Sequence, residues 1–412
     1  MRLYRILCVL LVAIFLLPIG ASLAQDSQPL VGTWDQCATP TSLPDTVSVG
    51  AVLGLTKAVA VYGTAQKNAI DLAVEEINTS HYLGDKPVLA ITVEDSAGDK
   101  DQAVAAMTKL IDEDKVVAVL GPTLSSEALA ADPIAQEAGT VVLGVSNTAN
   151  GLTTAQGMGD YVFRDSLPES AVIPGTIKQA TELLGLKKVA ILYGNDDAFT
   201  KSGYDIFKQS LTDNKVEIAD EETFAKGDVD FNSQLTKAIG TQPDALVVSA
   251  LAAEATQIII QARALGYTGH IIGGNGFNSP AVLNNSGKDA EGLIVGGAWN
   301  YGNPNPSESS VAFVKSYEAK YSTSPDQFAA QAYTGAWLLA TAVRCANSVD
   351  HKAVRDVLAG IKDFNSPLGV FSFDENRDPV HDPIAQLVVN GKFTPLASAM
   401  LSEARPEATA SS

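Results

Sequence analysis

The chain has 412 residues, of which 46% are apolar and 18% are charged. This is the composition of a globular protein with a substantial core. Its 47 acidic and 28 basic residues give a net charge of −19 at pH 7. This surplus argues against nucleic acid or an anionic membrane as partner, because both are negatively charged. Solubility is the simplest explanation for it.

The first 24 residues have the layout of a signal peptide. Arg2 and Arg5 precede an apolar run over residues 6–17, which is too short to span a bilayer as an anchoring helix. Ser22 and Ala24 supply the small residues that signal peptidase accepts, so cleavage is expected before residue 25. Cleavage would leave 388 residues (412 − 24). A chain of that length exceeds the usual size of a single core, so we expect two lobes.

The chain contains three cysteines. Cys8 lies inside the apolar run and would be removed, so no lipid-anchor cysteine is expected at the new N-terminus. Cys37 and Cys345 would remain, in a compartment where disulfides persist. A bond between them would fix an N-terminal extension, residues 25–45, to a late helix. Two unpaired thiols are the alternative, because sequence does not give the distance between them.

From residue 46 onward, short β-branched runs alternate with helical patterns, which is typical of parallel sheets with crossover helices. In a first series we expect strands at 47–53, 88–93, 116–120 and 141–145, and helices at 65–78, 102–112 and 126–137. Residues 161–166 lead to a second series, with strands at 188–193, 216–224, 245–249 and 270–273, and helices at 168–184, 202–214, 232–239 and 255–265. The sequence thus predicts an α/β protein with two doubly wound, Rossmann-like lobes.

The remaining elements close the fold. We expect strands at 293–297, 369–373 and 385–389, helices at 308–321, 328–346 and 352–359, and a disordered tail at 397–412. The helix at 328–346 is apolar enough to suggest a membrane span. Its polar residues Gln331, Thr334 and Arg344 favour a buried core helix instead.

No catalytic, metal or cofactor signature is evident in the sequence. It has no Walker-type phosphate loop and no Gly-x-Ser-x-Gly elbow, and its four histidines lie far apart. The glycine-rich segment 273–276 lacks the third glycine and the acidic residue of a dinucleotide fingerprint. A secreted hydrolase remains the alternative enzyme class, but the serines of segment 121–127 have no nearby histidine in the sequence.

Ligands of open α/β sheets bind beyond the carboxyl ends of the strands, so the loops that follow strands in the first lobe are the candidates for ligand contact. Ser125 and Ser126 lie at a predicted helix start, where hydroxyls and backbone amides suit a carboxylate. Ser125 could instead only cap its helix. The next such loop offers Ser146, Asn147 and Thr148, unless these side chains satisfy their own turn. The loop after the first strand leads to Tyr62, an aromatic wall with a polar tip.

In the second lobe the matching loops offer one or two polar groups beside an aromatic or small residue. They include Asp197 and Phe199, the segment 250–254, and Asn275 and Phe277. The alternative for Asp197 is a solvated turn.

The chain resembles the branched-chain amino acid and amide-binding proteins, the type I periplasmic binding family of ABC importers, over residues 46–396. Four segments carry the resemblance: Tyr-Gly at 62–63, Ala-Val-Glu-Glu-Ile-Asn at 73–78, Gly-Pro-x-x-Ser-Ser at 121–126 and Phe-Asp-Glu-Asn at 373–376. The resemblance implies two lobes joined by three crossovers, near Asp165, Trp299 and Asp374. Lobe 1 would then comprise 46–165 and 299–374, and lobe 2 would comprise 166–298 and 375–396.

By this resemblance, Ser125 and Thr148 are expected to hold a ligand carboxylate, Ser146 to offer its main chain and Tyr62 to form a pocket wall. Asn275 stands where the amino-acid binders have an acid. Either Asp197 or another acid therefore contacts the ligand ammonium, or the ligand carries no such charge. Amino acids, amides, small carboxylates and aromatic acids all stay open.

The implied function is capture of a small solute by hinge closure in the periplasm, for the permease subunits of an ABC importer. A monomer without cofactor is expected. A ligand-sensing receptor module of the same fold is the alternative.

Overall fold

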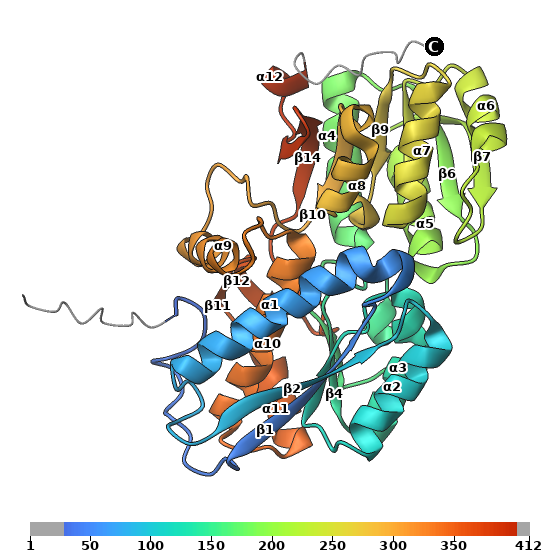
Figure 1. The fold of residues 1–412 in the computed structure, drawn as a ribbon. Coiled ribbons are helices and arrows are strands. Elements are labelled where there is room, and N and C mark those ends of the chain that lie inside the picture. The colour runs from blue at the N-terminus through green and yellow to red at the C-terminus, as the bar shows by residue number, and fades with distance from the viewer. Residues whose placement is uncertain (1–28, 402–412) are drawn as a thin grey trace, which may run out of the picture.

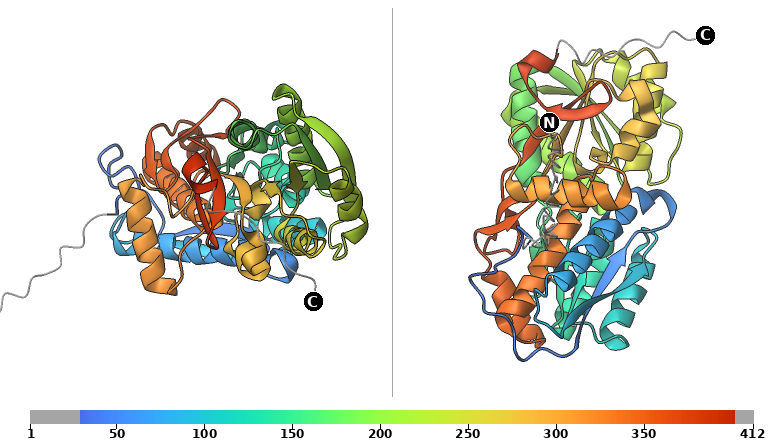
Figure 2. Two further views of the ribbon diagram at one scale, coloured as in Figure 1. Left: turned by 90° about the horizontal axis from the view of Figure 1, so that it is seen from above. Right: turned by 60° about the vertical axis from the view of Figure 1, so that its left-hand side comes forward.

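The computed structural model describes residues 29–401, so the predicted signal peptide at 1–24 lies outside the described residues. The chain folds into two α/β lobes, one above the other (Figure 1). In the right-hand view of Figure 2, helix α9 (Glu308–Tyr321) runs across the molecule at the level where the lobes meet. The predicted α/β class with two doubly wound lobes is confirmed.

The first lobe is built on a five-stranded parallel sheet in the order β2-β1-β3-β4-β5. Its strands are β1 (Thr46–Leu53), β2 (Val88–Asp95), β3 (Ala118–Leu120), β4 (Val141–Gly144) and β5 (Val162–Arg164). One face packs on α1 (Ala60–Thr79), α10 (Gln327–Ala346) and α11 (His351–Ala359), and the other on α2 (Lys100–Asp112) and α3 (Ser125–Ala138). Both faces are covered, so β3 and β4 are continuous apolar runs rather than alternating ones.

The second lobe is built on a seven-stranded sheet in the order β15-β14-β10-β9-β8-β6-β7. Its strands are β6 (Lys188–Gly194), β7 (Glu217–Phe224), β8 (Ala245–Ser249), β9 (His270–Gly273), β10 (Leu293–Gly297), β14 (Ile384–Val389) and β15 (Lys392–Pro395). Strands β6 to β10 are parallel, and β14 joins antiparallel to β10. Helices α4 (Glu169–Leu184) and α5 (Ala198–Asp213) cover one face. The other is covered by α6 (Asn232–Gly240), α7 (Ala252–Ala264) and α8 (Pro280–Ser286).

A small antiparallel sheet lies beside the first lobe and shares its core. It consists of β11 (Phe364–Ser366), β12 (Gly369–Phe373) and β13 (Pro379–Val380). The chain passes between the lobes after β5, after β10 and between β13 and β14. Strand β13 pairs with β12, so the third passage follows Val380.

No helix among residues 29–401 is long and apolar enough to cross a membrane, and α10 is a buried core helix.

Several helices begin earlier than their apolar periodicity predicts. Helix α5 begins at Ala198 because the Asp197 carboxylate accepts hydrogen bonds from the next two backbone amides, as an N-cap does. Five elements, α8, β5, β11, β13 and β15, were not predicted from sequence patterns. A short helix, α12 (Ser398–Leu401), also occupies the start of the tail that we expected to be disordered. Two of its residues, Met400 and Leu401, pack on the second-lobe core, and the rest of the tail lies outside the described residues.

The N-terminal segment is fixed to the end of α10. Cys37 and Cys345 form a disulfide across a sequence separation of 308 residues. The neighbouring Arg344 donates to the Cys37 carbonyl at 2.9 Å and stacks on the rings of Trp34 and Tyr82. Val31 of this segment belongs to the first-lobe core and Trp34 packs against it, so the extension covers apolar surface that would otherwise face water.

Replacing both cysteines, Cys37→Ser with Cys345→Ser, should lower the free energy of unfolding by about 2–4 kcal/mol, because the bond restricts a long loop of the unfolded chain. Denaturant titration of the double variant and of the reduced wild type should give the same lowered midpoint. Equal midpoints for oxidised wild type and double variant would show that the bond contributes nothing.

Candidate ligand-binding site

A narrow cavity lies between the two lobes, where strand ends of both sheets meet. The space open to the centres of water molecules is about 20 Å³, enough for one or two of them. Its lining comes from both lobes and comprises Tyr62, Thr123, Leu124, Ser125, Ser146, Phe199, Leu251, Asn275, Gly276 and Phe328. Except for Phe328, at the start of α10, each of these residues follows the carboxyl end of a parallel strand.

Buried hydrogen bonds connect the first-lobe loops to one another. The Gln66 amide on α1 donates to Ser146 Oγ at 2.7 Å and accepts from Thr123 Oγ1 at 2.7 Å. Ser146 Oγ donates to the Thr123 carbonyl at 2.6 Å, and Thr123 Oγ1 accepts from the Gly54 amide at 3.0 Å. The loops after β1, β3 and β4 are thereby held in one rigid wall.

Ser125 is the first residue of α3 and does not cap the helix. Its N-cap is Leu124, whose amide donates to the Glu127 carboxylate at 2.8 Å. Ser125 Oγ accepts from the Ala149 amide at 3.1 Å, so its hydroxyl hydrogen can still donate toward the cavity that the residue lines. A hydroxyl at the start of a 14-residue helix suits an anion.

Tyr62 joins the two lobes by hydrogen bonds. Its hydroxyl donates to the Gly276 carbonyl at 2.8 Å and accepts from the Ala252 amide at 2.7 Å. Burial raises the pKa of this phenol far above its usual value, so it stays protonated and able to donate. One first-lobe side chain thus forms hydrogen bonds with backbone groups of two different second-lobe loops.

The apolar part of the cavity is also shared between the lobes. Tyr62 packs against Phe328 with ring centroids 4.7 Å apart, and both belong to a cluster that includes Phe199 and Leu251 of the second lobe. This wall suits an aliphatic or aromatic group.

Asn275 connects three parts of the molecule. Its side-chain amide donates to the Ser146 carbonyl at 3.3 Å, its backbone N–H donates to the Glu169 carboxylate at 3.2 Å, and its Oδ1 accepts from Gln327. Asn275 therefore fixes the relative position of the two lobes as well as lining the cavity.

Glu169 is a buried acid behind the cavity wall, with 1% of its surface exposed. Its Oε1 also accepts from Thr148 Oγ1 at 3.4 Å, whereas Oε2 has no hydrogen-bond partner among the described residues. Burial raises the pKa of this carboxyl to about 7, against the weaker lowering effect of its hydrogen bonds. A Cβ on Gly274 would lie 3.2 Å from both carboxylate oxygens, so glycine leaves room for the acid.

The structure brings five of the ten predicted site residues to the cavity wall: Tyr62, Ser125, Ser146, Phe199 and Asn275. The other five lie behind it or beside it. Ser126 is half-buried on α3, and the Phe277 ring packs on Gly273. Asn147 donates to the Pro122 carbonyl, Thr148 contacts Glu169, and Asp197 caps α5.

Several residues of the candidate site were not predicted from the sequence. They are Thr123, Leu124, Leu251, Gly276 and Phe328 in the lining, and Gln66 and Glu169 behind it. Glu169 follows Pro168 at a predicted helix start, where an acid usually only stabilises the helix N-terminus. The sequence therefore contained no sign that Glu169 lies close to the cavity. Within residues 29–401, no group of three or more His, Cys, Asp or Glu could hold a metal ion.

Tyr62→Phe should weaken the contact between the lobes, because the Ala252 amide and the Gly276 carbonyl would both lose a buried partner, at about 1–3 kcal/mol. Small-angle X-ray scattering should show a larger radius of gyration for this variant. Tyr321→Phe is the control, since that hydroxyl donates to the Asn68 carbonyl within the first lobe. Identical scattering from Tyr62→Phe and wild type would contradict the bridging role.

A family model of periplasmic binding proteins matches residues 46–392. A Leu/Ile/Val-binding protein of Rhizobium johnstonii is 27% identical over 337 residues, which is 81% of this chain and 88% of the relative.

Solved structures of similar proteins share the fold, among them two with a bound ligand of known identity. A branched-chain amino acid transporter substrate-binding protein of Streptococcus pneumoniae, in complex with isoleucine, is 32% identical with a TM-score of 0.78, covering 84% of this chain and 97% of that one. An ABC-transporter solute-binding protein of R. palustris, in complex with benzoate, is 25% identical with a TM-score of 0.78, covering 85% and 95%. The chain therefore belongs to the periplasmic binding protein family, as a solute-binding protein of ABC transporters and not as an enzyme.

Proposed function

We propose that this protein captures a small α-amino acid with an apolar side chain in the cleft between its lobes and presents it to the membrane subunits of an ABC importer. Glu169 is the observation that carries the proposal. It is a buried carboxyl behind the cavity wall that bonds to Asn275 and Thr148 and has one oxygen unpartnered among the described residues.

The carboxylate end of such a ligand would lie on the first lobe. The start of α3 offers the Ser125 hydroxyl and a favourable helix dipole. Thr148, which contacts Glu169, would reach the same end once a ligand widens the narrow cavity. The Ser146 carbonyl, which now accepts from Asn275, would instead accept from the ammonium end of the ligand.

The ammonium end needs a negative partner, because an unpaired buried charge is costly. Asn275 cannot supply that charge, but Glu169, in direct contact with its backbone, can. Asp197 is less suited, because its carboxylate already caps α5. An ammonium beside Glu169 would lower the pKa of this carboxyl and stabilise its charged form.

An aromatic carboxylate is the second candidate, and the aromatic wall favours it. Tyr62, Phe199 and Phe328 would pack on a planar ring, and the benzoate complex of the R. palustris relative has the same fold. A ligand of this kind would leave Glu169 protonated, since no cation would face it.

The site of action follows from the family. Its members work outside the cytoplasm, and the predicted signal peptide supports export to the periplasm with cleavage near Ala24. Closure about the hinge would give the permease subunits a shape to recognise. A receptor that reads the same closed shape for sensing is the alternative partner.

A thermal-shift screen should identify the solute class. A ligand at a hundred times its dissociation constant raises the free energy of unfolding by about 2.7 kcal/mol. We expect stabilisation by leucine, isoleucine or valine, and weaker effects from benzoate and from amides. Stabilisation by benzoate alone would favour the second candidate, and no shift with any of these compounds would contradict the proposed function.

Glu169→Gln should weaken amino acid binding by about 2 kcal/mol, or roughly thirtyfold in Kd, because a hydrogen bond to a charged group is lost. In the wild type, affinity should rise as the pH increases through about 7, where Glu169 loses its proton and gains the charge that an ammonium needs. The variant should lose this pH dependence, and benzoate affinity should not rise with pH in either protein.

Titration calorimetry between pH 5.5 and 8.5 measures both effects. Asp132→Asn is the matched control, since Asp132 on α3 is also a buried acid outside the cavity lining, with one oxygen that finds no partner within residues 29–401. Equal pH profiles for wild type and Glu169→Gln would remove Glu169 from the site.

A further inference from the structure

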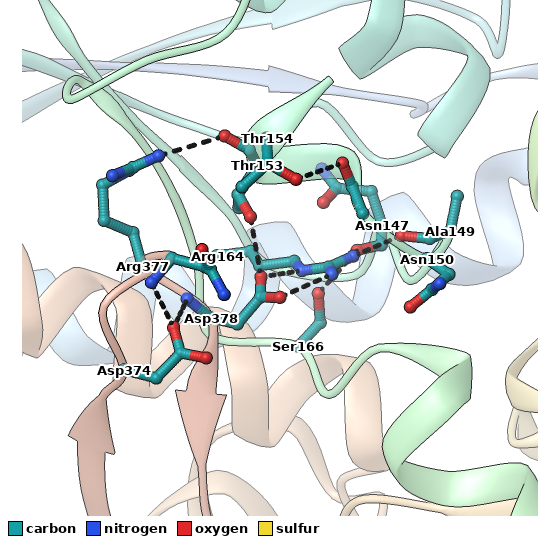
Figure 3. Close-up of polar contacts among 12 residues, drawn as sticks. Asn147, Ala149, Asn150, Thr153, Thr154, Arg164, Ser166, Asp374, Arg377 and Asp378 are labelled. Atoms are coloured by element: carbon teal, nitrogen blue, oxygen red, sulfur yellow. Dashed lines mark hydrogen bonds and ion pairs between the residues drawn. The ribbon is translucent and has the colours of Figure 1, made fainter.

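Arg164 and Asp378 form an ion pair next to residues 146–150, the loop after β4, which we call the cleft loop (Figure 3). The Arg164 side chain is fully buried. Its Nε donates to Asp378 Oδ1 at 2.6 Å and its Nη2 to Oδ2 at 3.1 Å, so the contact is bidentate. Such a pair has defined geometry and holds its two elements in a fixed orientation.

The third guanidinium nitrogen reaches the cleft loop. Arg164 Nη1 donates to the Ala149 carbonyl at 2.7 Å and to the Asn147 carbonyl at 3.3 Å, and Ser166 Oγ adds a bond to the Asn147 carbonyl at 2.9 Å. These residues flank Thr148 in the loop that also carries Ser146. Arg164 is thus shared between this loop and Asp378.

The turn that carries Asp378 has its own connections to the first lobe. The Asp374 carboxylate accepts from the Asp378 amide at 2.9 Å and so closes the turn. Arg377 donates to the Val162 carbonyl at 3.0 Å and to the Thr153 carbonyl at 3.2 Å, while Thr153 Oγ1 donates to Asp378 Oδ1 at 3.1 Å. The turn, β5 and the cleft loop form one polar unit.

The two partners lie next to different passages of the hinge. Arg164 is the last residue of β5, just before the chain first enters the second lobe. Asp378 precedes β13, which leads through the third passage into β14. The pair therefore connects the first and third hinge passages to each other and to loop 146–150.

On its other side the same loop contacts the second lobe at three points. The Ser146 carbonyl accepts from Asn275, the Thr148 carbonyl accepts from the Glu169 amide at 2.9 Å, and the Asn150 amide donates to Ser202 Oγ at 2.7 Å. Any displacement of the loop would disturb these contacts and the ligand groups together.

We propose that Arg164 and Asp378 are positioning residues, which hold loop 146–150 in its binding geometry and link it to the angle of the hinge. This inference rests on the proposed function, since it assumes that the loop contacts the solute. Removing one charge leaves the other buried and unpaired, which no carbonyl of the loop can compensate. Within residues 29–401, the hydrogen bonds of both side chains go to each other and to Asn147, Ala149 and Thr153 of the first lobe, so the effect should be local.

Asp378→Asn and Arg164→Lys test the proposal in the full chain. The first removes the charge, and the second keeps a charge but loses the bidentate fork. Amide hydrogen exchange of residues 146–154 should become faster in both variants without added ligand, and calorimetry should give about tenfold weaker isoleucine binding. Arg263→Lys is the control, since Arg263 is a buried second-lobe arginine that donates to the Tyr267 and Gly269 carbonyls, and its isoleucine affinity should equal that of wild type.

The readouts separate the outcomes. Unchanged loop exchange in both variants would overturn the proposal whether or not a solute binds. Faster exchange with unchanged affinity would make the pair a purely structural anchor and overturn its positioning role. If the wild-type chain binds neither isoleucine nor any other solute of the screen, the proposed function is overturned, and the binding role of the pair with it. The exchange data would then still decide whether the pair holds the loop.

Discussion

The carboxyl ends of two parallel sheets face one another across this molecule, and that constraint places nearly every residue of the cleft. Parallel strands end at one edge of their sheet, so the loops after β1, β3 and β4 meet on one lobe, and those after β6, β8 and β9 meet on the other. Side chains far apart in sequence, such as Tyr62 and Asn275, therefore become neighbours. The loops need no special sequence to converge, and their residues are left to determine which solute fits.

Polar contacts join the lobes around a small apolar centre, which suits a closure that must be reversible. Tyr62 satisfies two backbone groups of the second lobe, and Asn275 returns a contact to the first. Each bond contributes little net free energy, about 1 kcal/mol, because water replaces it when the lobes separate. A ligand that touches both lobes can therefore shift the equilibrium between open and closed forms with a modest amount of binding energy. In the proposed function, the buried Glu169 would add a charge requirement that selects among solutes of similar size.

Periodicity predicted much of the fold, and half of the residues chosen by strand-end reasoning line the cavity. Buried parallel strands such as β8 are apolar throughout, so they are evident from sequence, and Tyr62 and Ser125 follow from their place after such strands. Strand β13 has only two residues, and the chain around β11 and β15 has no clear alternation, so these elements depend on tertiary contacts. Glu169 and Gln66 lie on helices and act through the packing of other elements, which no local pattern encodes. Asp197 shows the opposite error, in which a strand-end loop suggests a ligand contact but the polar side chain caps its own helix, α5, instead.

The central claim is that a solute bridges the two lobes and closes the hinge. Distance measurement between spin labels at exposed residues Glu113, beside α2, and Asp213, at the end of α5, tests it most directly, because the two positions belong to different lobes. With saturating isoleucine, the account predicts one narrow distance distribution for the closed form, and without ligand a broader distribution that extends to longer distances. Identical distributions in the two conditions, at a concentration where calorimetry shows binding, would contradict closure as the mechanism of capture.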